Sequence, residues 1–133
     1  MHRIIYTGIF YLAMPVILVR LLIRSFRAKA YRQRIGERFA LQPLPEGFEN
    51  DRLTLWIHAV SVGETAASAP LVAELRRRNP EAQIVITTMT PTGSDRVRLL
   101  FGDSVFHSYI PYDLPEACNR FLSNYQPRLL GLM

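Results

Sequence analysis

The sequence predicts an α/β fold with a parallel sheet, preceded by an apolar N-terminal helix. From residue 51 onward, short apolar and β-branched runs alternate with segments whose apolar residues recur at helical spacing. Strands separated by helices in this way form parallel sheets with right-handed crossovers. The first fifty residues differ, because a long uncharged run precedes a basic cluster. We therefore expect a membrane anchor helix at 1–23, a basic juxtamembrane helix and proline-containing linker at 24–50, and the α/β domain at 51–133.

The N-terminal run is uncharged from Ile4 to Val19, and three further apolar residues follow Arg20. A 16-residue helix reaches about 24 Å, which is short of a hydrocarbon core of about 30 Å. A run extended to Ile23 is long enough if Arg20 directs its charged head toward the lipid headgroups. The alternative is a core helix of a soluble domain. We favour a membrane helix over a cleaved signal peptide because basic residues, and no small-residue cleavage site, follow the run.

The segment after this run carries the excess positive charge. Residues 1–50 contain eight Lys and Arg against three acids, whereas residues 51–133 contain eight of each, so the net charge of +5 lies in the first part. Such a run is usually a solvated face, but beside a membrane each basic residue near anionic lipid contributes about 1 kcal/mol. The positive-inside rule places this flank in the cytoplasm. A local excess of this kind does not indicate nucleic-acid binding. At helical spacing one face carries Arg20, Arg24, Arg27, Arg34 and Arg38, and the first four are predicted to lie at the membrane surface.

The α/β domain follows a linker at 42–47 whose two prolines break any helix. Its outline is Rossmann-like, and the fourth strand is expected to be buried. Asp113 is predicted to cap the last helix, with Glu116 at the third helical position. A single cysteine, Cys118, excludes an internal disulfide. The expected strands are 53–58, 82–88, 105–110 and 128–133, and the expected helices are 61–78, 91–101 and one that starts after Asp113.

The turn after the first strand holds the strongest candidate for chemistry. Glu64 is the one acid in this turn, and polar groups at such strand-to-helix junctions lie where open α/β folds bind ligands. In one interpretation Ser61 and Glu64 form a capping box at the helix start. In the other, Glu64 takes a proton from a substrate hydroxyl. Gly63 is compatible with both, because it lets a backbone or ligand approach closely.

A second turn, at residues 87–94, contains hydroxyl groups and a glycine before a helix. A helix N-terminus attracts anions, so Thr92, Gly93 and Ser94 are candidates for contact with a phosphate. The alternative is that Thr90 caps the helix and Pro91 occupies its first position. No ligand cluster accompanies His58 or His107, so we expect satisfied strand-end histidines and no metal site. No P-loop, nucleophile elbow or dinucleotide fingerprint is present.

Three segments together resemble a known family. They are WIHAVSVGET (residues 56–65), TTMTPTGS (87–94) and YIPYD (109–113), and they occur in the order found in bacterial 3-deoxy-D-manno-octulosonic acid (Kdo) transferases. These are enzymes of lipopolysaccharide synthesis at the inner membrane. The resemblance implies the glycosyltransferase-B arrangement, in which two Rossmann-like domains enclose the active site. This chain would then be the N-terminal, acceptor-side half or a truncated product, without the second domain that binds most of the donor.

The resemblance also implies a reaction. Kdo would pass from CMP-Kdo to a lipid A precursor (lipid IVA) with inversion, and Glu64 would be the general base. Ser61 and Gly63 would contact the acceptor or a phosphate, no cofactor or metal would be needed, and the partners would include anionic inner-membrane lipids. The protein would be held on the cytoplasmic side by a single N-terminal anchor. The alternatives are a non-catalytic, membrane-docked fragment that binds anionic lipid, and another two-domain glycosyltransferase.

Overall fold

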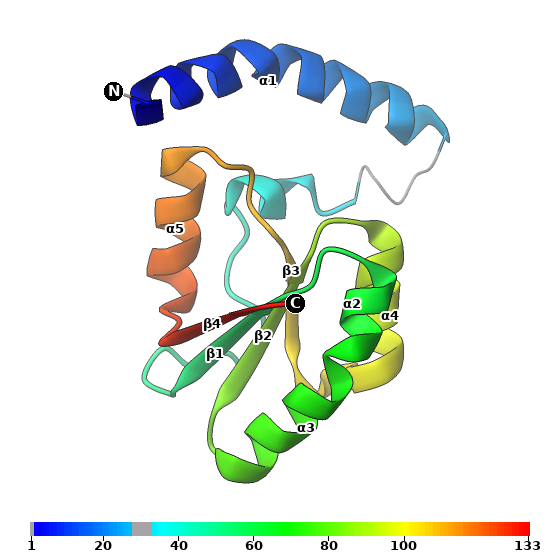
Figure 1. Ribbon diagram of the computed structural model, residues 1–133, viewed down its shortest axis with the longest axis vertical. Helices are drawn as coiled ribbons and strands as arrows, with labels where there is room; N and C mark the ends of the chain where they lie inside the picture. The colour runs from blue at the N-terminus through cyan, green and yellow to red at the C-terminus, as the bar shows by residue number, and fades with distance from the viewer. Residues whose placement is uncertain (1, 28–32) are drawn as a thin grey trace.

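Helix α1 (His2–Arg27) lies across one end of an α/β domain in the computed structural model, which describes residues 2–27 and 33–133 (Figure 1). The domain has three layers, with α5 on one side of a central sheet and α2, α3 and α4 on the other (Figure 1). The fold class predicted from the sequence, an apolar N-terminal helix followed by a parallel α/β sheet, is confirmed.

The sheet contains four parallel strands in the order β3-β2-β1-β4. At the centre Ile57 of β1 is paired with Ile86 of β2 on one side and Gly131 of β4 on the other. Each strand falls within the range predicted for it. Their bounds are β1 (Thr54–His58), β2 (Gln83–Thr88), β3 (Phe106–Tyr109) and β4 (Leu129–Leu132).

The helices cover the two faces of the sheet unequally. Alternate residues of a strand point to opposite faces, which separates the core into two clusters. One cluster joins Ile57 and Ile86 to Val72 of α3 and Val97 of α4. The other is built around Phe121 of α5, whose ring centroid lies 4.8 Å from that of Trp56. The remaining elements are α2 (Val62–Ala67), α3 (Ala69–Arg78), α4 (Pro91–Phe101), α5 (Pro115–Tyr125) and the 3-10 helices η2 (Ile35–Phe39) and η3 (Gly102–Ser104).

Two local expectations are wrong. Strand β4 is exposed rather than buried, because it is an edge strand: Leu129 is 54% and Leu132 is 72% accessible to solvent. Asp113 does not cap α5. Leu114 occupies the N-cap position with Pro115 next to it, and Asp113 instead accepts a hydrogen bond from the Tyr6 hydroxyl of α1 at 2.7 Å. A long-range partner has therefore replaced the local one.

Helix α1 is fastened along the domain and exposes an apolar stripe on its outer side. A second tyrosine, Tyr11, donates a hydrogen bond to Glu116 at the start of α5. By length and composition alone, the 20 residues Ile4–Ile23, with a mean hydropathy of 1.9, are sufficient to cross a membrane. Six residues spaced three or four apart form the outer stripe, and each is more than half exposed: Ile5, Ile9, Leu12, Val16, Val19 and Ile23.

The predicted helical face of basic residues does not continue through Arg34. Helix α1 ends at Arg27, and Arg34 has a left-handed backbone (φ 62°) as the N-cap of η2, so the helical spacing predicted through Arg38 is interrupted. Arg20 lies on α1 and is exposed. The side chains of Arg24 and Arg27 lie outside the described part of the chain, so their predicted place at the membrane surface stays a prediction.

Candidate active site

The candidate site lies at the carboxyl edge of the sheet, at the point where the strand order reverses. The chain proceeds from β1 through β2 to β3 on one side, and α5 then returns it to β4 on the other side of β1. In open α/β sheets, ligands bind outside the carboxyl ends of the strands at such a switch point. The turn that carries Glu64 follows β1 directly and therefore occupies this position.

Ser61 and Glu64 form the capping box that was one of the two interpretations of this turn. The Ser61 hydroxyl accepts a hydrogen bond from the Glu64 backbone N–H at 3.2 Å. The Glu64 carboxylate in turn accepts from the backbone N–H groups of Val60 at 2.5 Å and Ser61 at 3.2 Å. These bonds satisfy donors that a helix start leaves unpaired, and they fix the direction of the carboxylate.

The same bonds leave part of the Glu64 carboxylate available. Both backbone donors bind Oε2, and Oε1 accepts no hydrogen bond within the described ranges 2–27 and 33–133. The side chain is partly exposed. Gly63 leaves open space beside it, since a Cβ there would first meet the Ser61 hydroxyl at 3.8 Å. An ionised carboxylate with one oxygen free can accept a proton from a hydroxyl group.

The second turn is closed by its own hydrogen bonds. Thr90 caps α4 by accepting from the Gly93 N–H at 3.1 Å, and Pro91 follows at the first helical position, as the capping alternative predicted. Gly93 and Ser94 are buried, and only Thr92 of the three candidate phosphate contacts is exposed. A phosphate role for these three residues therefore stays a prediction, with fewer free donors than the sequence suggested.

A polar cluster that sequence analysis did not identify fixes η2 against this edge. Arg34 forms a bidentate ion pair with Glu37 and donates to the Ser94 hydroxyl at 2.9 Å. Its Nη2 also lies 2.8 Å from Nδ1 of His107, and Glu37 accepts from the Tyr109 N–H at 2.9 Å. The cluster joins η2, α4 and β3 across more than 70 residues of sequence, so no local pattern could have indicated it.

His107 is neutral in this cluster. Its Nδ1 accepts from Arg34, which leaves Nε2–H to donate to the Thr88 hydroxyl at 2.9 Å. Burial, together with the positive charges of Arg34 and Arg98, lowers the pKa of His107 from 6.5 to about 3. His58 is also satisfied, with Nδ1 2.9 Å from the Thr87 hydroxyl. Among the described residues, no group of three or more His, Cys, Asp or Glu is placed to hold a metal ion.

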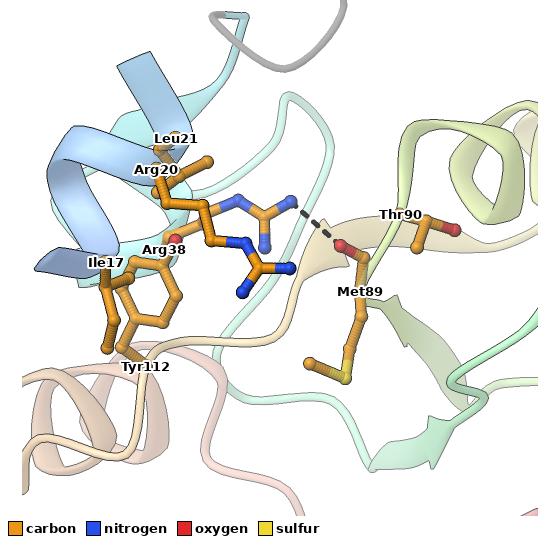
Figure 2. A pocket seen from close by; sticks show the side chains of 7 residues that line it. All are labelled: Ile17, Arg20, Leu21, Arg38, Met89, Thr90 and Tyr112. Carbon is orange, nitrogen blue, oxygen red and sulfur yellow. Dashed lines mark hydrogen bonds between the residues drawn. The ribbon is translucent and has the colours of Figure 1, made fainter. Parts of the chain in front are cut away.

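A pocket of about 250 Å³ opens between α1 and the carboxyl edge (Figure 2). Two arginines enter it, Arg20 from α1 and Arg38 from η2. Arg38 is only 6% exposed, and its Nη2 donates to the Met89 carbonyl oxygen at 2.8 Å. Its guanidinium also lies over the Tyr109 ring, 4.5 Å from the centroid. The pocket is lined by Ile17, Arg20, Leu21, Arg38, Met89, Thr90 and Tyr112.

Comparison with known families identifies one match to most of the chain. The sequence model described as "3-Deoxy-D-manno-octulosonic-acid transferase (kdotransferase)" matches residues 33–133. The match contains both turns, the whole sheet and the Arg34 cluster, and it begins after α1.

Individual relatives agree with this match. The chain is 42% identical over 138 residues to the 3-deoxy-D-manno-octulosonic acid transferase of Haemophilus influenzae, and this alignment covers 100% of this chain and 31% of that protein. The protein of the same name in Bordetella pertussis is 39% identical over 59% of this chain and 19% of its own length. A probable mitochondrial one in Arabidopsis thaliana is 27% identical over 97% of this chain and 28% of its own length. The chain thus spans about a third, or less, of the relatives it matches, and no solved structure matches it.

Proposed function

The chain belongs to the 3-deoxy-D-manno-octulosonic acid (Kdo) transferase family, and from this premise we propose that it forms the acceptor-side part of an enzyme that transfers Kdo. The donor is CMP-Kdo, bound mainly by a second domain, and the acceptor is a lipid A precursor of the lipid IVA type. The observation that carries the proposal is the position of Glu64, whose partly exposed carboxylate follows β1 at the switch point of the sheet.

In this proposal Glu64 is the general base. Its carboxylate accepts the proton of an acceptor hydroxyl while that oxygen attacks the anomeric carbon of Kdo, and CMP leaves from the opposite face, so the configuration inverts. The capping hydrogen bonds to Oε2 support this role, because they orient the carboxylate and leave Oε1 to face the substrate. Ser61 and Gly63 of the same turn would contact the acceptor or its phosphate.

We also propose that α1 attaches the protein to the cytoplasmic side of the bacterial inner membrane. The outer apolar stripe supports this, since Leu12 is 82% and Val16 is 68% exposed. Two hydrogen bonds, from Tyr6 to Asp113 and from Tyr11 to Glu116, hold the helix along the domain rather than away from it. A helix in this position lies in the membrane interface with its apolar face inserted. Anionic lipids would contact its exposed Arg20.

The test of the proposed reaction uses the full-length gene product with CMP-Kdo and a lipid A precursor, and follows the mass of the acceptor. We expect Glu64→Gln to slow transfer by at least ~100-fold, because the amide cannot accept a proton, while the amide oxygen still caps the helix and the melting temperature changes little. The matched control is Ser61→Ala, which should cost about 1 kcal/mol of stability with a smaller loss of rate. Near-wild-type turnover in Glu64→Gln would show that Glu64 is only a cap.

A further inference from the structure

Arg38 is a nearly buried cation without a carboxylate partner. It is 6% exposed, yet no ion pair joins it to an Asp or Glu in the part of the chain that the structure describes. The acids on the neighbouring segments are bonded elsewhere, Glu37 to Arg34 and Asp113 to Tyr6. Hydrogen bonding to the Met89 carbonyl uses one of the five N–H donors of the guanidinium. The rings of Tyr109 and Tyr112, with centroids 4.5 and 5.9 Å from the guanidinium carbon, stabilise part of this charge. They supply no acceptor in the guanidinium plane, so the remaining N–H donors suit an anion from outside the chain.

A second arginine approaches the same space. Figure 2 shows the guanidinium groups of Arg20 and Arg38 entering one pocket from α1 and η2, on the side of Met89. No hydrogen bond or ion pair of Arg20 occurs among the described residues. Two like charges that share a pocket repel each other. An anion bound between them attracts both, and this attraction offsets the repulsion. Two planar forks of N–H donors suit an oxyanion that can accept several bonds at once.

From these observations we infer that the pocket between α1 and η2 binds the phosphate group of an amphiphile, with Arg20 and Arg38 as its two cationic contacts. The walls support an amphiphile, because Ile17, Leu21 and Met89 supply apolar surface next to the two charges. The volume of about 250 Å³ limits what enters: it accommodates a phosphate and the atoms attached to it, and it is below the range of about 300 to 1,000 Å³ typical of sites that enclose a whole small molecule.

The inference deepens the proposed function and rests on it for the identity of the natural ligand, a phosphorylated lipid acceptor. The site is separate from Glu64, since it is built by α1, η2 and the loops after β2 and β3 rather than by the turn after β1. A phosphate held here would keep the headgroup of a lipid at the carboxyl edge of the sheet, where α1 meets the membrane in our proposal. The same charges could bind free phosphate, so the experiment has to separate the two sources.

Binding is measured by calorimetry on the full chain with three probes: dihexanoyl phosphatidic acid below its micelle concentration, inorganic phosphate, and uncharged dihexanoylglycerol. We expect phosphatidic acid to bind, inorganic phosphate to bind more weakly, and dihexanoylglycerol not to bind. Arg20→Gln should weaken the binding of phosphatidic acid about tenfold, as expected for the loss of one charge-assisted contact. The matched control is Arg76→Gln, an exposed arginine of α3 that lies outside the pocket and should leave binding unchanged.

Arg38 is tested with Arg38→Lys, which keeps the charge but loses the fork, and melting curves show whether the variant folds. If Arg38→Lys does not fold, the binding measurement on Arg20→Gln tests the site by itself. Equal binding by wild type and Arg20→Gln would overturn the site, as would equal binding of dihexanoylglycerol. Equal affinity for inorganic phosphate would overturn the assignment to an amphiphile. Because no Kdo donor is present, these results stand whether or not the full-length protein transfers Kdo.

Discussion

Protonation of His107 should destabilise the fold in mild acid. The ring accepts a hydrogen bond from Arg34 through Nδ1, and a protonated ring would place a positive charge 2.8 Å from that guanidinium. Burial is the first reason that the pKa of His107 is lowered to about 3, and the charges of Arg34 and Arg98 contribute further. In the unfolded chain neither cause is present, so the pKa of His107 is the ordinary value of 6.5.

The size of the effect follows from these two values. Between pH 6.5 and about 3 the unfolded chain binds a proton that the folded chain does not bind, so stability falls as the pH falls through this window. Each pH unit within the window corresponds to about 1.4 kcal/mol. Lowering the pH from 6.5 to 4.5 should therefore cost about 2 to 3 kcal/mol from this one group. That is a large part of a typical stability of about 5–15 kcal/mol.

The assay is urea unfolding at pH 7 and pH 4.5, followed by the fluorescence of Trp56, the one tryptophan of the chain. The comparison is with His107→Gln, which has no titrating ring. Glu74 and Glu116, whose pKa values are lowered by hydrogen bonds from Arg77 and Tyr11 respectively, also lose stabilisation in acid, but they do so equally in both proteins. We expect the acid-induced loss to be about 2 kcal/mol smaller in the variant. Equal losses in the two proteins would refute the assignment.

Two further predictions follow from the geometry of the turns and of α1. Gly93→Ala should cost about 1 kcal/mol of stability, because the added Cβ would lie 3.1 Å from the Cβ of Thr88. Gly63→Ala should be neutral or slightly stabilising, because the added Cβ has open space in α2. Urea unfolding of both variants tests this, and equal stabilities would contradict it. Deletion of residues 1–27 should release the protein from membranes and keep the domain folded, because the Arg34 cluster remains. Sedimentation with membranes in high salt after this deletion would contradict the anchor.

Local sequence signals predicted much of the fold. Thr90 followed by Pro91 marks the start of α4, and the predicted helix 91–101 matches the observed Pro91–Phe101. The capping box of Ser61 and Glu64 was recognisable because both partners lie within four residues. Strands β1 and β2 were predicted from their continuous apolar and β-branched runs, which is typical of strands buried on both faces.

The remaining features depend on contacts between distant parts of the chain. Asp113 looked like a helix cap, yet Tyr6 binds it from a helix 107 residues earlier in the chain. Arg34 looked like one of a row of membrane-facing arginines, but its partners Ser94 and His107 lie 60 and 73 residues away. Arg38 gave no sign that it would be buried, because a charged residue in a basic run is usually solvated. No pattern within a short window of sequence reports such pairings.

Capping and catalysis do not exclude each other at Glu64, because the two carboxylate oxygens have different partners. Oε2 accepts from the backbone N–H groups of Val60 and Ser61, and this holds the side chain in one direction. Oε1 accepts no hydrogen bond from the described residues 2–27 and 33–133, so it stays available to a substrate. A base must be held in the correct place before its proton affinity matters, and a capping box supplies that constraint from the helix itself. In our proposal, the frequent sequence signal for a helix start thus also fixes the general base at the carboxyl edge of the parallel sheet.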